Sequence, residues 1–373
     1  MERMRDDDAC PGALQVHQAA DGALARLRLP GGMITAAQLE ALAHTATEFG
    51  NGTLELTVRG NLQLRGVRDA TAVADAAAAA GLLPSPTHER VRNIVASPLS
   101  GRVGGLADVR PWVTDLDIAI RADPDLARLP GRFLFGIDDG RGDISGLGAD
   151  VGAHVVPDGV ALLLAGRDTG IRLATSEVVV ALLTVARRFV EVRGKSWRIA
   201  ELDDPSALVS DFDVTAPAGT TYPPVVRPPV GWIAQDDGGV ALGAAVPLGV
   251  LTARQAEFVA AIDAPVVITP WRSLLVCDMS DGVADTALRV LAPMGLVFDE
   301  SSPWLDISSC VGSPGCEKSL ADVRAEATRV ASEGVDGRAG GHVHYVGCER
   351  ACGSPPTGQV FVATTEGFRP ASR

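Results

Sequence analysis

The chain has 373 residues, of which 46% are hydrophobic and 21% are charged, with 41 Gly and 24 Pro. This composition excludes collagen-like, low-complexity and wholly disordered proteins, and the length indicates two or more packed domains. The formal net charge of −13 argues against a general nucleic-acid binder or a binder of anionic membranes, since both need positive faces. An anionic ligand would therefore have to be bound by a local cluster of cations.

The N-terminal segment, 1–10, contains three consecutive Asp residues and no apolar core, so it is not typical of a secretory signal. The longest apolar run, 178–192, is interrupted by Arg187, Arg188 and Glu191, which argues against a membrane span. We therefore expect a cytoplasmic protein. In that compartment the six Cys residues indicate metal binding rather than a disulfide framework.

An internal duplication organises the chain. The segment 29–35 is echoed by 246–252, and in each copy a Thr residue, Thr35 or Thr252, stands where the N-cap of a following helix belongs. Each copy continues with two β-rich runs and a second helical pattern, at 54–58, 62–64 and 70–80 in the first and at 266–269, 274–276 and 283–291 in the second. Both copies therefore predict the order strand, helix, strand, strand, helix, strand, close to a ferredoxin-like unit.

A different kind of module follows each copy. The first, roughly 91–213, contains two predicted strands and a long helix at 176–192, and a Pro- and Thr-rich linker comes after it. The second is a cysteine-bearing region, 309–353, with a predicted helix and a strand at 342–346. We predict an α+β fold with pseudo-two-fold duplication, in which two ferredoxin-like units are each followed by an α/β unit, with domains at 1–90, 91–215, 231–300 and 301–373 and a linker at 216–230.

Four cysteines form the sharpest motif of the sequence. Cys310 and Cys316 make a C-x5-C pair, and Cys348 and Cys352 make a C-x3-C pair 31 residues further on. Four thiolates in two close pairs can hold a 4Fe-4S cluster. Structural zinc prefers shorter spacings than the first pair, although zinc and purely structural thiols remain alternatives.

The cysteine pairs and the duplication together resemble the nitrite and sulfite reductase superfamily over nearly the whole chain. The resemblance implies two pseudo-symmetric halves, and it implies that Cys352, the last cluster ligand, also bridges to a sirohaem iron. Three basic motifs of that superfamily have counterparts here, in the segments 57–66, 92–95 and 129–134. They imply catalytic roles for Arg59, Arg92 and Arg132, and cofactor binding by Arg59, Arg65, Arg92 and Arg132.

One position departs from the superfamily pattern. Leu134 stands where the third motif has a second Lys, which removes a cation that an oxyanion-reducing enzyme uses. The segment 59–102 nevertheless contains six Arg residues against two Asp and one Glu. This local excess of positive charge fits a site for a polycarboxylate, the alternative being a solvated surface with ordinary ion pairs.

Within the superfamily, three further segments resemble the precorrin-3B synthase family: the Cys10-Pro11-Gly12 start, the Arg-x-Arg-x-Pro-Gly-Gly run at 26–32 and the Asp-rich turn at 138–143. Those enzymes insert one oxygen atom of O2 into precorrin-3A, with lactone formation, in aerobic cobalamin synthesis. The resemblance therefore implies precorrin-3A and O2 as substrates, a 4Fe-4S cluster and a second iron centre, either non-haem iron or sirohaem. It also implies an external electron donor, a ferredoxin or a reductase.

The remaining candidates have simpler interpretations. His342 and His344 lie two apart on a predicted strand and so share a face, as iron ligands or as ordinary sheet residues. We expect Cys277 to be a buried core thiol and Cys10 a free thiol. The segment 101–105 lacks the full dinucleotide-binding pattern. Two other functions stay open, namely a sirohaem-dependent nitrite or sulfite reductase and an iron–sulfur electron carrier or regulatory module without catalysis.

Overall fold

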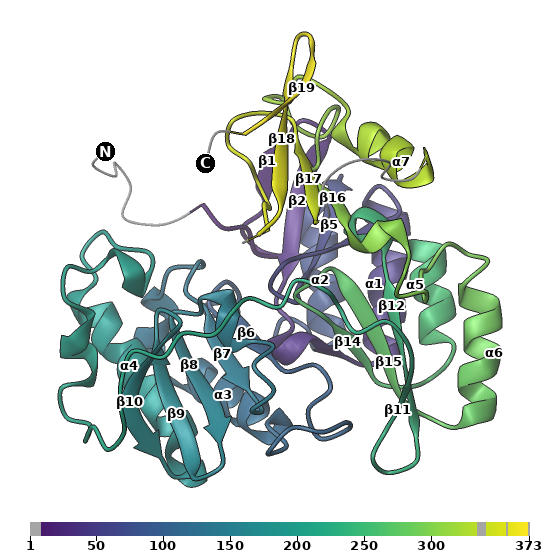
Figure 1. Ribbon diagram of the computed structural model, residues 1–373. Coiled ribbons are helices and arrows are strands. Elements are labelled where there is room, and N and C mark those ends of the chain that lie inside the picture. The colour runs from purple at the N-terminus through teal and green to yellow at the C-terminus, as the bar shows by residue number, and fades with distance from the viewer. Residues whose placement is uncertain (1–8, 334–340, 356, 372–373) are drawn as a thin grey trace.

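The computed structural model describes residues 9–333, 341–355 and 357–371, which form four β-sheets with helices packed against them. Two five-stranded sheets belong to the duplicated ferredoxin-like units. A third five-stranded sheet and a four-stranded sheet belong to the α/β units, at the lower left and the top of Figure 1. The predicted pattern of two ferredoxin-like units, each followed by an α/β unit, is therefore confirmed. The exact domain boundaries remain predictions.

The first ferredoxin-like sheet has the strand order β1-β2-β5-β4-β13. Its strands are β1 (His17–Ala19), β2 (Gly22–Leu27), β5 (Leu62–Val67), β4 (Thr53–Leu56) and β13 (Val250–Thr252), and its helices are α1 (Ala36–Phe49) and α2 (Ala70–Ala79). The second has the order β11-β12-β15-β14-β3. It contains β11 (Gly231–Ala234), β12 (Val240–Ala245), β15 (Ser273–Met279), β14 (Val266–Ile268) and β3 (Met33–Ile34), with α5 (Ala253–Ala260) and α6 (Asp281–Leu291).

The two ferredoxin-like units exchange an edge strand. Strand β3 of the first copy pairs with β14 of the second, and β13 of the second copy pairs with β4 of the first, both antiparallel. One apolar core runs through both units as a consequence, from Leu39 and Leu64 to Leu251 and Leu274. The exchange explains the echoed segments of the sequence, because each supplies the strand that crosses to the other sheet.

Both predicted N-caps are present. Thr35 accepts a hydrogen bond from the backbone of Gln38, and Thr252 accepts one from Gln255. In each case the Gln side chain accepts a hydrogen bond from the backbone N–H of the Thr in return, which completes a capping box. The two copies therefore start α1 and α5 by the same local device.

The two α/β units share one strand plan. In the first, β6 (Ile94–Ala96), β7 (Phe135–Asp138) and β8 (Val151–Val156) are parallel, and β9 (Gly159–Leu164) and β10 (Arg167–Leu173) continue antiparallel beside α3 (Arg110–Ala122) and α4 (Val178–Val192). In the second, β16 (Ile307–Ser309), β17 (Val343–Val346) and β18 (Gln359–Thr364) are parallel, and β19 (Gly367–Pro370) is antiparallel. Helix α7 (Val323–Glu333) follows β16.

The structure corrects one detail of the predicted duplication. In the second copy the strand expected after α6 is reduced to an isolated bridge between Val297 and Ala245 of β12, and in the described part of the first copy no strand of the same sheet follows α2 directly. Short 3-10 helices connect many elements, at Pro30–Gly32, Pro124–Arg128, Ser145–Leu147, Thr175–Glu177, Ile199–Glu201, Pro205–Val209, Pro247–Gly249 and Pro303–Leu305. Among the described residues, no helix has the length and apolar character that crossing a membrane requires.

Candidate functional site

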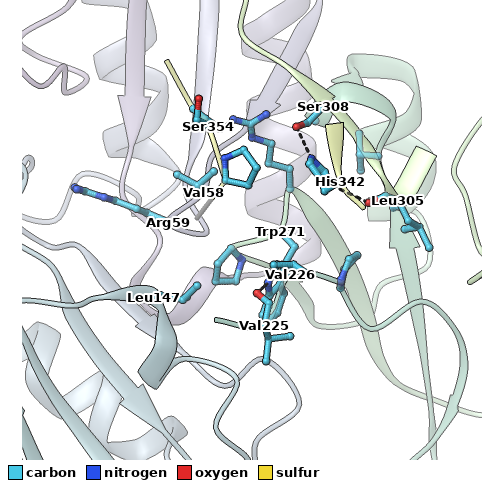
Figure 2. Close-up of a pocket in the computed structure, with 18 of the residues that line it drawn as sticks. Val58, Arg59, Leu147, Val225, Val226, Trp271, Leu305, Ser308, His342 and Ser354 are labelled. Atoms are coloured by element: carbon cyan, nitrogen blue, oxygen red, sulfur yellow. Dashed lines mark hydrogen bonds between the residues drawn. The ribbon is translucent and has the colours of Figure 1, made fainter. Parts of the chain in front are cut away.

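A cavity of about 400 Å³ lies where all the domains meet. Its wall comes from the β4–β5 turn of the first copy, the first α/β unit, the linker, the second copy and the cysteine-bearing unit. Figure 2 shows Arg59 and Val58 across the cavity from His342 and Leu305. The volume is in the usual range of small-molecule sites, and the wall reaches Gly353, the residue directly after Cys352.

Two equivalent turns, one from each ferredoxin-like unit, face this cavity. In the first, Thr57 N donates to Asn61 O over 2.9 Å and Gly60 N donates to Thr57 O over 3.1 Å. In the second, Thr269 N donates to Ser273 O over 2.9 Å and Arg272 N donates to Thr269 O over 3.2 Å. Arg272 therefore occupies the place that Gly60 has in the first copy, and both residues have a positive φ, 56° and 65°.

The cavity wall is mostly apolar but contains three arginines: Arg59, Arg198 and Arg272. Burial first and then the nearby charge of Arg198 lower the pKa of Arg59 to about 10. The side chain of Arg59 donates to Gly131 O over 3.3 Å, and within the described residues no carboxylate pairs with it. Arg198 is paired with Asp150, with 2.6 Å between Nε and Oδ2. The cavity thus presents unneutralised positive charge to a ligand.

The four motif cysteines lie on two loops at the carboxyl ends of β16 and β17. None of the six cysteines of the chain forms a disulfide. The pKa of the Cys352 thiol is raised by burial first and then by the charges of Cys310, Cys348 and Cys316. The charges of all three act on one thiol, so the two pairs lie in the same region of the protein, and a shared metal site on them remains a prediction.

The cysteine loops are held by contacts that leave the thiols available. Gly347 N donates to Cys310 Sγ over 3.3 Å, the kind of N–H···S contact that stabilises a thiolate. Arg65 donates to Gly315 O over 2.8 Å and pairs with Asp21 through two hydrogen bonds of 2.9 and 2.7 Å. Arg65 therefore connects the first sheet to the loop that ends in Cys316.

A chain of hydrogen bonds joins the cavity wall to Cys352. Ser308 Oγ lies 2.6 Å from His342 Nε2 and 2.7 Å from His344 Nδ1, and His344 Nε2 lies 3.0 Å from Cys352 O. A carbonyl oxygen only accepts, so His344 must donate from Nε2 and accept from Ser308 at Nδ1. Burial lowers the pKa of His344 to about 3, which keeps the ring neutral. Both nitrogens are engaged, which favours the sheet-residue interpretation over iron ligation.

The structure places the four predicted arginines differently from one another. Arg59 lines the cavity, and Arg65 contacts the Cys316 loop. Arg92 is buried in a pair with Asp117 of α3, with 2.5 Å between Nε and Oδ1. Arg132 is exposed, with its guanidinium 5.1 Å from the ring centroid of Trp197. Within the described residues, Arg65, Arg92 and Arg132 lie outside the cavity lining, so their predicted contacts with a ligand gain no support from it.

Two cavity arginines, Arg198 and Arg272, were missed by the sequence analysis. Leu134, where the superfamily pattern has a Lys, is buried and lines the cavity as an apolar residue. The duplication itself could have indicated Arg272, since aligning Thr57 with Thr269 places both following turns at the same site. Arg198 belongs to no recognisable motif.

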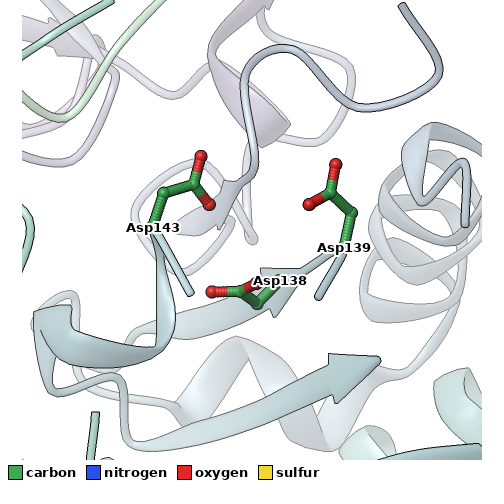
Figure 3. A group of neighbouring side chains, drawn as sticks. All are labelled: Asp138, Asp139 and Asp143. Atoms are coloured by element: carbon green, nitrogen blue, oxygen red, sulfur yellow. The ribbon is translucent and has the colours of Figure 1, made fainter. Parts of the chain in front are cut away.

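Three carboxylates in the first α/β unit also lie together. Figure 3 shows Asp138, Asp139 and Asp143, whose oxygens lie within 4.8 Å of one another. Asp139 pairs with Arg141 over 2.6 Å, and Ser97 Oγ donates to Asp143 Oδ1 over 2.6 Å. Burial raises the pKa of Asp143 to about 7, which reduces repulsion within the group. These internal contacts explain the cluster as part of the fold.

Comparisons with known proteins agree with this architecture. The nitrite/sulfite reductase ferredoxin-like half domain matches residues 17–80. Precorrin-3B synthase of Sinorhizobium sp. is 29% identical over 385 aligned residues, covering 96% of this chain and 81% of that protein. The ferredoxin–nitrite reductase of Synechococcus elongatus is 34% identical over 127 residues, 32% of this chain and 25% of that enzyme. The structure of the Mycobacterium tuberculosis NirA protein superposes with a TM-score of 0.75 at 20% identity, covering 93% of this chain and 74% of that one.

The chain thus has the fold of the nitrite/sulfite reductase-like superfamily, and the resemblance predicted from its motifs is confirmed. Within that class, a sequence similarity over nearly the whole chain is to a precorrin-3B synthase. It confirms the narrower resemblance to that family and the prediction that the chain is an enzyme.

Proposed function

We propose that this enzyme is a precorrin-3B synthase, an iron–sulfur monooxygenase that converts precorrin-3A to precorrin-3B in aerobic cobalamin synthesis. One atom of O2 enters the macrocycle, and the other leaves as water after uptake of two electrons and two protons. The observation that carries the proposal is the position of the cavity. Both halves and the linker enclose it, it contains arginines, and it ends beside Cys352.

The cysteine set fits a 4Fe-4S cluster. Cys310, Cys316, Cys348 and Cys352 form no disulfides, and burial first and then the charges of the first three raise the pKa of the Cys352 thiol. Gly312 and Gly315 lack side chains where a Cβ would lie 2.6 and 2.7 Å from Val323 and Val311, so these loops pack too closely for larger residues. The cluster, when bound, would supply electrons one at a time.

The lining of the cavity suits one edge of a large anionic macrocycle. Arg59 is placed to bind a carboxylate of precorrin-3A, a charge-assisted contact worth roughly 1.5 to 3 kcal/mol. Trp271 and Trp304 offer flat apolar surfaces on the same wall. The second iron centre is proposed as sirohaem or non-haem iron beside Cys352, and the external electron donor as a ferredoxin or reductase. We also propose a cytoplasmic location.

Leu134 separates this proposal from its alternative, a sirohaem nitrite or sulfite reductase. A small oxyanion at the cavity wall would need cations close around it, whereas Leu134 presents a buried apolar side chain there. An apolar contact suits the face of a macrocycle better than it suits nitrite or sulfite.

The test is anaerobic purification followed by iron and labile-sulfide analysis, absorption spectroscopy and assay with precorrin-3A. We expect four cluster irons per chain, broad cluster absorbance and turnover that requires both O2 and a reductant. A strong Soret band with nitrite or sulfite reduction, and no turnover of precorrin-3A, would establish the alternative. A matched Cys277→Ser variant, changed at a buried cysteine of the second copy, should retain its iron.

A further inference from the structure

Arg272 stands at a backbone position that ordinarily selects glycine. Its φ of 56° lies in the left-handed region, and its counterpart in the first copy is Gly60, with φ 65°. A non-glycine residue held there is strained. An arginine at this position is therefore disfavoured by the local backbone, and a reason for it must come from what its side chain contacts.

The side chain of Arg272 reaches both cysteine loops. Its Nη1 donates to Ser309 O over 3.2 Å and its Nη2 donates to Gly353 O over 3.4 Å. These two carbonyls belong to the residues adjacent to Cys310 and Cys352. One guanidinium thus contacts the residue before the first cysteine of the first pair and the residue after the last cysteine of the second pair.

The positive charge of Arg272 is not neutralised by the protein. Carbonyl groups satisfy its hydrogen bonds but carry no net charge, and in the described ranges no carboxylate forms an ion pair with it. Glu55, the acid with the largest effect on its pKa, is already paired with Arg324. Arg272 is partly buried, and a cation removed from water without a counter-ion is costly, so we expect an anion beside it in the working enzyme.

Two anions could fill that role, a ligand carboxylate in the cavity or the cluster with its four thiolates. The hydrogen bonds favour the cluster, because they connect Arg272 to both cysteine loops at once. The pKa of Arg272 is lowered by burial first, and Cys310 is among the groups whose charge opposes that shift. The geometry therefore directs the guanidinium toward the cysteines.

We infer that Arg272 is the positioning residue that compensates the negative charge of the iron–sulfur cluster and raises its reduction potential. This inference rests on the proposed function, since it requires a cluster on the four cysteines. Adding an electron to the cluster makes it more negative, and a fixed neighbouring cation stabilises that state. Net charge and hydrogen bonding near a cluster are known determinants of its potential.

Two substitutions separate charge from backbone strain. Arg272→Gly removes the charge and relieves the strain at the positive φ, so this variant should fold and incorporate iron and sulfide as the wild type does. Arg272→Lys keeps the charge. Arg289→Gln is the control, because it removes a guanidinium that is exposed on α6 and paired with Asp285.

The measurement is the midpoint potential of the cluster, by spectroelectrochemistry of tetrapyrrole-free protein. We expect Arg272→Gly to shift the ratio of reduced to oxidised cluster at least tenfold toward the oxidised form, which is about 59 mV for one electron. Arg272→Lys and Arg289→Gln should shift that ratio less than twofold.

Each possible outcome of these measurements either supports or contradicts the role inferred for Arg272. Wild-type protein that binds no cluster would overturn the proposed function and this inference with it. A normal cluster with an unchanged potential in Arg272→Gly would overturn the inference alone, as would weaker tetrapyrrole binding without any shift. If Arg272→Gly fails to retain a cluster, Arg272→Lys decides: a wild-type potential supports charge compensation, and a tenfold shift contradicts it.

Discussion

The two α/β units use one backbone arrangement for two different purposes. In the first unit, Ser97 follows β6, and its N–H donates to Ile137 O over 3.1 Å. In the second unit, Cys310 follows β16, and its N–H donates to Tyr345 O over 2.9 Å. Ser97 and Cys310 are therefore structural equivalents.

The equivalence extends to the next loop. Asp139 N donates to Ser97 Oγ over 3.1 Å, and Gly347 N donates to Cys310 Sγ over 3.3 Å. Around this shared contact, the first unit gathers three carboxylates and Arg141, whereas the second gathers four cysteines. The comparison teaches that the backbone brings two loops together in both units. The side chains then decide what the loops hold, which is each other in the first unit and, by our proposal, a metal cluster in the second.

The largest effect is expected from Cys310→Ser, which replaces the sulfur of the second unit with the hydroxyl oxygen that Ser97 has in the first. Cys310→Ser should lose the cluster and with it all activity, because three thiolates hold the cluster poorly and a hydroxyl is a weak iron ligand. Iron and labile sulfide per chain, measured after anaerobic reconstitution, give the readout. The reciprocal Ser97→Cys variant should leave iron content unchanged, and full iron content in Cys310→Ser would refute the ligand assignment.

A smaller effect is expected at the cavity turn of the first copy. Arg59→Ala should weaken tetrapyrrole binding about 10- to 100-fold while leaving the cluster intact, since one charge-assisted contact is lost. Affinity can be followed by absorbance titration. Arg68→Ala is the matched control, as Arg68 is exposed and donates to the backbone carbonyls of Glu48 and Gly50. Unchanged affinity in Arg59→Ala would show that this guanidinium does not contact the ligand.

The acidic group of the first unit gives a pH-dependent prediction. Burial raises the pKa of Asp143 from 3.8 to about 7 in the folded protein. The folded state then holds a proton that the unfolded state releases, so this carboxyl lowers stability as the pH rises from about 4 to about 7. Asp143→Asn cannot titrate, and its stability relative to the wild type should increase over that window by up to a few kcal/mol.

Denaturant unfolding at pH 5 and pH 8 measures this difference. Asp125→Asn, at an exposed carboxylate of the same unit, should show no comparable trend. A stability difference between Asp143→Asn and the wild type that is equal at both pH values would mean that Asp143 is already ionised at pH 5.

The smallest effects are expected at the two capping boxes, where the copies are alike. Thr35→Ala and Thr252→Ala should each lower the free energy of unfolding by about 1 kcal/mol. The Thr→Ser changes at the same positions keep the hydroxyl and should have little effect. A large difference between the two Ala variants would show that the caps are not equivalent despite their matching geometry.

Motifs confined to a few residues could be predicted from the sequence. The caps at Thr35 and Thr252 and the duplicated order of elements were predicted correctly, because these depend on near neighbours. The role of Arg92 was not predictable in the same way. Its motif matched the superfamily, but its guanidinium pairs with Asp117 on α3, a helix that the sequence analysis did not identify.

The cavity itself depends on contacts that sequence spacing does not encode. Arg198 and Arg272 come from separate domains, and they reach one wall only because the halves and the linker pack together. The strand exchange of β3 and β13 fixes this packing, since it ties each ferredoxin-like sheet to the other copy.

The sequence alone determined the duplication, the helix starts and the cysteine spacing, because each is a short-range pattern of residue types. Only the tertiary structure decided which arginines face the cavity, which are used in internal ion pairs, and that Arg272 reaches both cysteine loops. The physical reason is that the role of a charged side chain depends on the groups it contacts, and those groups lie tens to hundreds of residues away along the chain.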